Sequence, residues 1–378
     1  MLDAGTSPDA PGADAGSVPD AASDGSSVDE ASVDGASPAS DAGQEYAFMA
    51  TYLGGVRVFA LDGRSGAPAE IDGSPFGGGA GLSALAIDPT HTFLYVVDTN
   101  AAAVDGYRIA PATGVLSHLD AFPLALGGTP FTIAIHPSGR FAYVGDDKSL
   151  FAFSIDPASG AFTPVDHSPF DLSGTAAYVA ADPSGHYLYV SHAGPAGIEA
   201  FAIDDAGVVD RVDGSPFGAA SVHGGAIVFH PNGRFVYNAS GLISGFALDP
   251  SSGALAPLAG TPVDGGRSDP MAVDLAIEPR GHFLYAVNNA TDALAAFAID
   301  GTTGALTPLA GSPFDGGEAP YAAAVDPDGR FLYVNNDDVD QQSVFSVDPA
   351  SGQLTPIPGS PFSPSGLQPE TVIVRLGH

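Results

Sequence analysis

The stretch Asp326-Pro-Asp-Gly-Arg-Phe-Leu-Tyr-Val-Asn-Asn336 decides the fold. It places a proline at the second position of a type I turn and a glycine at the fourth, while the aspartate side chain can bond back to the backbone. The residues from Phe331 to Val334 are aromatic, apolar or β-branched, which is typical of a buried strand. The stretch therefore predicts a tight turn followed by a strand.

The same turn and strand occur six times along the chain. Each copy has an acidic residue or histidine before the proline, and an aromatic residue with a tyrosine two places later. Successive copies are 48, 46, 48, 48 and 48 residues apart. They begin at Asp88, His136, Asp182, His230, Glu278 and Asp326.

A second motif of the Gly-Ser-Pro-Phe type occurs seven times. Its copies are Gly73–Phe76, Ala121–Leu124, His167–Phe170, Gly214–Phe217, Gly260–Val263, Gly311–Phe314 and Gly359–Phe362. Between the turns, apolar residues alternate with period two, as in half-buried strands, and no helical period is sustained. Repeated units of this length with four short antiparallel strands are typical of β-propellers. The sequence predicts an all-β, seven-bladed propeller.

The two ends of the repeat region complement each other. Residues 369–374 match the inner strand predicted at residues 320–325, while residues 46–76 supply three further strands of the same unit. We therefore expect one blade to be shared by the N- and C-terminal segments, which leaves no open sheet edge where the ring closes.

Residues 1–43 differ in composition from the rest. They hold eight Asp, one Glu and no Lys, Arg or aromatic residue, so they cannot bury enough apolar surface to fold. We expect a disordered tail over residues 1–43 and the propeller over residues 44–378. The tail resembles the spacers of bacterial envelope lipoproteins, but these residues include no cysteine for lipid attachment. Either the signal segment and the cysteine lie upstream of residue 1, or the resemblance is one of composition alone. An extracytoplasmic location is expected, and a cytoplasmic one is the alternative.

Composition excludes several classes of function. With 44 acidic and 11 basic residues the formal charge is −33, and Lys148 is the one lysine, so nucleic acid and anionic membranes are excluded as partners. No apolar run is long enough for a transmembrane helix. There is no cysteine, and the run Asp337–Asp340 lacks the spacing of a calcium loop, so we predict no metal and no cofactor. A monomer is expected.

The repeat resembles the lactonase-like family of seven-bladed propellers, which includes propeller-type 6-phosphogluconolactonases and carboxymuconate cyclases. The resemblance rests on Pro-x-Gly-Arg-Phe-x-Tyr and Gly-Ala-Leu-Thr-Pro motifs, as in residues 230–237 and 300–308, and it covers residues 45–374. If the chain is an enzyme, the resemblance implies a lactone hydrolase or a cycloisomerase.

The family's enzymes carry Pro-Arg-His at the start of an inner strand and Asn-Glu after the second strand. The positions that match the first motif are Pro130-Phe131-Thr132, Pro320-Tyr321-Ala322 and Pro369-Glu370-Thr371, none with the Arg or the His. Those that match the second are Asn336-Asp337 and Asn288-Asn289.

Opening a lactone requires a general base for water and donors for the developing oxyanion. His223 or His192 is the candidate base, Arg267 the donor, and Glu318 the residue that orients the imidazole. Ligand-binding residues are expected in the same loops, at the mouth of the central channel: Asn336, Asp337, Asn288, Asn289 and Lys148. The alternative is that all of these are ordinary loop residues.

Two functions remain open. The first is hydrolysis of a sugar lactone or related cyclic ester bound at the channel mouth. The alternative is a non-catalytic envelope propeller that binds a small ligand or a protein. A phosphorylated lactone would require several basic residues at the mouth, and only Arg267 and Lys148 are expected there.

Overall fold

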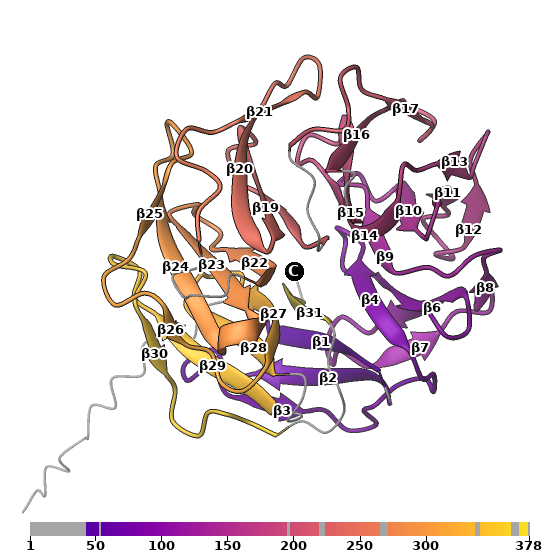
Figure 1. The fold of residues 1–378 in the computed structure, drawn as a ribbon. Helices are drawn as coiled ribbons and strands as arrows, with labels where there is room; N and C mark the ends of the chain where they lie inside the picture. Colours follow the sequence, from indigo (N-terminus) through magenta and orange to yellow (C-terminus); the bar gives the residue numbers. More distant parts are fainter. Residues whose placement is uncertain are drawn as a thin grey trace, which may run out of the picture. The chain divides into compact units, whose positions relative to one another are not determined.

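Seven antiparallel sheets form the folded part of the chain (Figure 1). The computed structural model describes residues 43–52, 54–194, 197–218, 224–264, 271–336, 341–363 and 370–376. Within these ranges the one helical element is a short 3-10 turn, Asn289–Thr291. The inner strands, in blade order 1 to 7, are β31 (Glu370–Arg375), β4 (Leu82–Ile87), β9 (Thr132–Ile135), β14 (Thr175–Ala181), β18 (Ile227–Phe229), β22 (Ala272–Ile277) and β27 (Pro320–Val325).

Each inner strand pairs with a second strand, the second strand pairs with a third, and the third pairs with a fourth. The second strands are β1 (Glu45–Thr51), β5 (Phe93–Asp98), β10 (Phe141–Gly145), β15 (Tyr187–Ala193), β19 (Phe235–Ser240), β23 (Phe283–Asn288) and β28 (Phe331–Asn336). The third strands are β2 (Gly55–Leu61), β6 (Ala103–Ile109), β11 (Ser149–Ile155), β16 (Ile198–Ile203), β20 (Leu242–Leu248), β24 (Ala293–Ile299) and β29 (Gln341–Val347).

The outer strands are short. They are β3 (Pro68–Glu70), β7 (Leu116–His118), β12 (Phe162–Pro164), β17 (Val209–Arg211), β21 (Leu255–Pro257), β25 (Leu306–Pro308) and β30 (Leu354–Pro356). Three two-residue strands pair with the third strands of blades 2, 3 and 6: β8 (Leu124–Ala125), β13 (Phe170–Asp171) and β26 (Phe314–Asp315). Short outer strands limit the exposed edge of each sheet.

The apolar core lies between neighbouring sheets. One cluster, for example, joins Phe93 and Val97 of blade 2 to Val144 and Phe153 of blade 3. Six repeat tyrosines are buried in these interfaces, and each hydroxyl donates to a glycine carbonyl in the next blade. The pairs are Tyr95–Gly160, Tyr143–Gly207, Tyr189–Gly253, Tyr237–Gly304, Tyr285–Gly352 and Tyr333–Gly66, at 2.8 to 3.3 Å. The repeat tyrosine is therefore a packing residue that ties each blade to the next.

The residue that opens each repeat also has a structural function. The Asp88 carboxylate accepts hydrogen bonds from the backbone N–H groups that follow its turn, including Thr92 at 2.7 Å. His136 and His230 occupy the same position and reach the next blade, where their Nε2 atoms lie 2.7 and 2.9 Å from the carbonyl oxygens of Gly185 and Gly281. These two histidines therefore belong to the scaffold.

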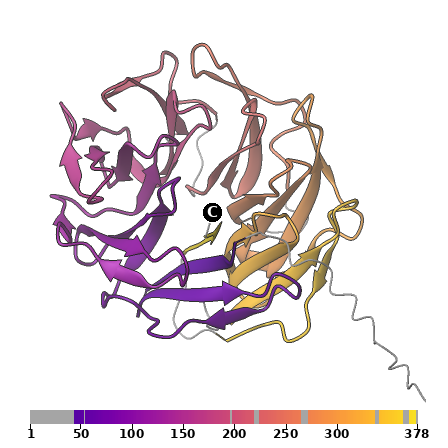
Figure 2. The same ribbon diagram turned by 180° about the vertical axis from the view of Figure 1, so that it is seen from behind.

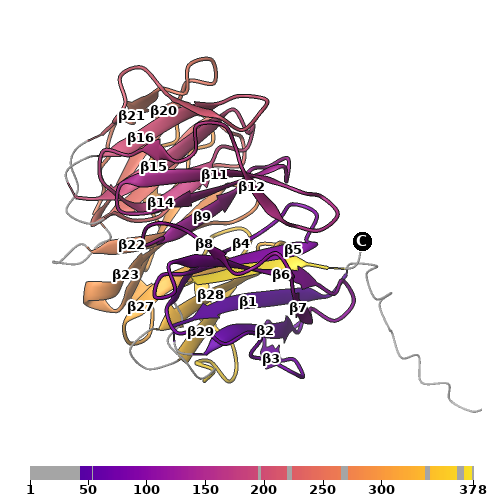
Figure 3. The same ribbon diagram turned by 90° about the vertical axis from the view of Figure 1, so that its right-hand side faces the viewer.

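One blade combines the two ends of the folded region. In it β31 pairs with β1, whose other neighbour is β2, in the order β3-β2-β1-β31. Figure 2 and Figure 3 show the yellow β31 beside the indigo β1 from behind and from the side. The predicted all-β, seven-bladed propeller and its shared closing blade are confirmed.

The predicted tail, residues 1–43, lies outside the described residues apart from Gly43. Residues 42–378 form one compact unit. In the described part of this unit, no helix is long and apolar enough to span a bilayer.

Candidate functional site

Four of the polar residues at or next to the ends of second strands lie at one level of the ring. Asp98, His192, Asn288 and Asn336 each pair with a residue at or next to the start of the inner strand of their own blade. The repeat brings these four side chains to equivalent places, at the same end of the propeller. They differ in what they contact.

Two of the predicted asparagines, Asn288 and Asn336, are buried. Asn336 is 1% exposed, and its amide donates to the Gly316 carbonyl at 2.9 Å and accepts from the backbone N–H of Ser343 at 3.1 Å. Asn288 is also buried, and the neighbouring Asn289 donates to the Pro320 carbonyl at 3.1 Å. The contacts found for Asn336 and Asn289 are with the protein itself, which is a structural role.

The other predicted site residues are dispersed. Lys148 and Glu318 are exposed, in the turn before β11 and in the loop before β27 respectively. His223, Arg267 and Asp337 lie outside the described residues, so the predicted grouping of a histidine with Arg267 and Glu318 stays a prediction.

His192 lies beside a carboxylate that the sequence analysis did not identify. Its Nε2 is 2.8 Å from Oε2 of Glu199 on β16, and both side chains are buried. The Glu199 carboxylate also forms an ion pair with Arg211 of β17 and accepts a hydrogen bond from the backbone N–H of Ser173 at 3.0 Å. The guanidinium of Arg211 lies 5.4 Å from the centre of the Phe201 ring.

The environment of His192 disfavours its protonated form. Burial lowers the pKa of His192 and the nearby Arg211 adds to this, while the backbone of Gly174 and Thr175 opposes it. A general base must reach the proton that it abstracts, and His192 is only 2% exposed. The arrangement stabilises blade 4 and leaves the imidazole ring of His192 without direct access to solvent.

A pocket of about 200 Å³ lies between blades 1 and 2, at the same end of the ring. Its polar side chains are Asp98, Asp105 and Tyr107, and Gly78 and Gly79 form part of its rim. Asp105 accepts a hydrogen bond from the Tyr107 hydroxyl at 2.9 Å and lies 2.7 Å from Nε2 of His118. Burial, followed by the charge of Asp105, raises the pKa of Tyr107, so this hydroxyl stays protonated.

The rim of this pocket depends on glycine. A Cβ atom at position 79 would lie 2.6 Å from Oδ2 of Asp98, too close for a normal contact. Among the described residues, the backbone N–H groups of Gly78 and Gly79 have no hydrogen-bond acceptor. The pocket thus offers carboxylate acceptors together with available backbone donors, and none of the residues that line it is Lys or Arg.

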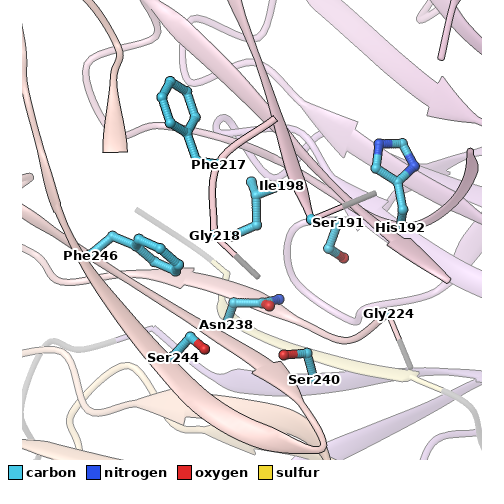
Figure 4. A pocket seen from close by; sticks show the side chains of 11 residues that line it. Ser191, His192, Ile198, Phe217, Gly218, Gly224, Asn238, Ser240, Ser244 and Phe246 are labelled. Atoms are coloured by element: carbon cyan, nitrogen blue, oxygen red, sulfur yellow. The ribbon is translucent and has the colours of Figure 1, made fainter. Parts of the chain in front are cut away.

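A second pocket, between blades 4 and 5, is much smaller (Figure 4). Its volume of about 20 Å³ is room for one water. The Ser191 hydroxyl and the Asn238 amide donate to the Gly225 carbonyl at 2.7 and 3.1 Å, so they fix the entry to β18. In Figure 4 the His192 ring points away from these two side chains. We therefore place the ligand site in the larger pocket.

Asp274 is a partly buried acid outside both pockets. It lies on β22, and its Oδ2 accepts a hydrogen bond from the backbone N–H of Ala323 on β27 at 2.7 Å, which links the inner strands of blades 6 and 7. Burial raises the pKa of Asp274 to about 6, against the opposing effect of the Ala323 and Leu275 backbone. The folded protein therefore binds this proton more tightly than the unfolded chain does.

Replacement of Asp274 by Asn should change how stability depends on pH. Because the folded-state pKa is the higher one, wild-type stability should fall as pH rises from about 4 through about 6, and Asp274→Asn should remove that fall. At pH 7.5 we expect the variant to be about 1–2 kcal/mol more stable, since each pKa unit is worth about 1.4 kcal/mol and the side chain is partly exposed. Urea unfolding between pH 4 and 8 measures this, with the exposed Asp213→Asn as control. Parallel pH profiles of wild type and Asp274→Asn would contradict the assignment.

Comparisons with known proteins agree with the fold. The sequence model of the family "Lactonase, 7-bladed beta-propeller" matches residues 12–265 and 223–368. No protein with a curated description matches the sequence. A candidate 6-phosphogluconolactonase from Bacteroides fragilis shares 20% identity, with a TM-score of 0.76, over 89% of this chain and all of its own. The periplasmic gluconolactonase of Pseudomonas aeruginosa shares 22% identity, with a TM-score of 0.74, over 88% of this chain and all of its own.

The two structural likenesses are below 25% identity and concern the fold, whereas the sequence model covers most of the chain. The protein belongs to the lactonase family of seven-bladed β-propellers.

Proposed function

We propose that this propeller binds and hydrolyses a neutral sugar lactone in the pocket between blades 1 and 2. The observation that carries the proposal is the lining of that pocket. It contains the carboxylates of Asp98 and Asp105 and the hydroxyl of Tyr107, and it contains no Lys or Arg. Carboxylates accept hydrogen bonds from sugar hydroxyls but repel a phosphate. The similarity to gluconolactonases of known fold supports the choice of a lactone.

The proposed reaction is the addition of water to the lactone carbonyl. Asp98 takes a proton as the water oxygen attacks the carbonyl carbon, and backbone N–H groups of the rim stabilise the oxyanion. The intermediate then expels the ring oxygen, which receives a proton, and the product is the open hydroxy acid. Asp98 is suited to this role because its Oδ1 is held by the Ala101 N–H at 2.7 Å while Oδ2 faces the rim at Gly79.

A second candidate is binding without turnover. It is favoured by the burial of His192, the one predicted catalytic histidine that the structure describes. In that case the same pocket would hold a neutral polyhydroxylated ligand, and the protein would serve as a receptor.

One experiment separates these functions. The full chain is assayed by pH-stat against δ-gluconolactone and its 6-phosphate, and binding is measured by calorimetry with the stable polyol sorbitol. We expect hydrolysis above the spontaneous rate, with kcat/KM at least about tenfold higher for the neutral lactone, since tenfold corresponds to 1.4 kcal/mol. Gly79→Ala should lose most of this activity because the new Cβ displaces Asp98.

The matched control is Gly127→Ala in blade 3, where a Cβ would meet no atom within 4 Å. Saturable binding without turnover would select the receptor function. A preference for the 6-phosphate, or neither binding nor turnover, would rule out this pocket.

A further inference from the structure

Three acidic side chains converge where blade 7 meets the closing blade. Glu45 begins β1, while Asp326 and Asp328 belong to the turn before β28. One carboxylate oxygen from each lies within 4.8 Å of the others. Glu45 and Asp326 are 5% and 0% exposed, and Asp328 is half-buried. Bringing like charges together in a buried place is costly unless a positive charge compensates them.

The equivalent turns of other blades show what is unusual here. In blade 4 the Asp182 Oδ2 accepts hydrogen bonds from the hydroxyl and, at 3.0 Å, from the N–H of Ser184. Thr90 does the same for Asp88 in blade 2. In blade 7 the residue at that position is Asp328, so the turn has a second carboxylate in place of a hydroxyl donor.

One oxygen of Asp326 is left without a hydrogen-bond donor as a result. Its Oδ1 accepts the backbone N–H groups of Arg330 and Phe331, at 2.5 and 2.8 Å. Its Oδ2 is fully buried and has no hydrogen-bond donor among the described residues. Arg330 pairs with Asp328 at 2.8 Å, but its Nε is 3.7 Å from Asp326 Oδ2, beyond hydrogen-bond distance. The guanidinium of Arg330 thus faces both carboxylates of the turn.

We propose that Glu45, Asp326 and Asp328 bind a divalent cation of the calcium type. Calcium takes carboxylate oxygens at about 2.3–2.6 Å, so one ion can contact three oxygens that lie within 4.8 Å of one another. Backbone carbonyls and waters complete its shell. The ion joins the turn of blade 7 to the first strand of the closing blade, so its binding stabilises the closed ring. The competing arrangement is compensation of the turn carboxylates by Arg330 alone, without an ion.

The test compares the EDTA-treated full chain with and without millimolar CaCl₂. We expect calcium to raise Tm by about 5 °C, from the stabilisation that a ligand at about 100 times its Kd provides. Terbium luminescence titration should show one saturable site. Asp328→Ser recreates the turn of blade 4, so it should fold and lose the calcium shift. The control Asp213→Ser removes the same charge from an exposed turn and should keep the shift.

Glu45→Gln provides a second, near-isosteric variant, and it should also lose the calcium shift. Residues 1–43 are the same in all these variants, so any calcium bound by their acidic side chains cannot account for a difference between them. No Tm shift in the wild type would mean compensation by Arg330 alone and would overturn the proposal. A full calcium response in both Asp328→Ser and Glu45→Gln would equally overturn it.

Discussion

Replacing Arg211 by Met is expected to lower the free energy of unfolding by about 3–5 kcal/mol, the usual cost of leaving a buried charge without its partner. The carboxylate of Glu199 is fully buried, and Arg211 is the cation paired with it. In the variant, the N–H and the hydroxyl of Ser173 remain as donors to Glu199, but His192 is held neutral by its burial. The methionine keeps apolar contact with Phe201, so the loss measures the ion pair rather than the packing.

The double variant Glu199→Gln with Arg211→Met provides the internal check. Because it removes both charges, it should be more stable than Arg211→Met alone. Arg140→Met is a matched control, since Arg140 also lies over a phenylalanine, 5.0 Å from the Phe141 ring centre, and donates to a backbone carbonyl without contacting a buried acid. Guanidinium unfolding measures all three. Equal losses in Arg211→Met and Arg140→Met would show that the Glu199 pair contributes nothing.

The repeat could be predicted well because its residues act through the backbone. A proline, a glycine and an acid at fixed offsets define a turn wherever they occur, so six copies determine six strand starts. The tyrosine that follows each turn lies in the interface with the next blade. Blade number and closure follow from such local rules.

The site could not be predicted in this way because it depends on residues that differ between blades. In three blades, a charged residue of the third strand contacts a side chain of the outer strand: Arg57 with Glu70, Asp105 with His118, and Glu199 with Arg211. In the other four blades, the outer strand has a proline at the partner's position: Pro164, Pro257, Pro308 and Pro356.

The sequence itself distinguishes the three blades that carry these charged pairs. A charge two residues before the aromatic residue of the third strand, together with a missing outer proline, marks blades 1, 2 and 4. To predict which charged residues contact each other, the register between the third and outer strands must be known. The repeat alone does not determine this register. Asp328 was overlooked for a similar reason, because its neighbour Glu45 is far away in sequence.

Asp98→Asn should reduce kcat for δ-gluconolactone by about 100-fold or more, the usual contribution of a general base. Asparagine keeps the size of the side chain, and its oxygen can still accept the Ala101 N–H that shapes the turn. The pocket should therefore keep its form, and KM should change little because Asp105, Tyr107 and the glycine rim still hold the substrate.

Asp146→Asn is the matched control for this variant. Asp146 has the equivalent place in blade 3, and its Oδ1 likewise accepts a turn N–H, from Lys148 at 2.8 Å, but it does not line the pocket. Steady-state rates and thermal unfolding of both variants separate catalysis from folding. If Asp98→Asn folds, binds and turns over the lactone like the wild type, Asp98 is not the base. If both variants lose activity equally while remaining folded, the chemistry does not take place in the pocket between blades 1 and 2.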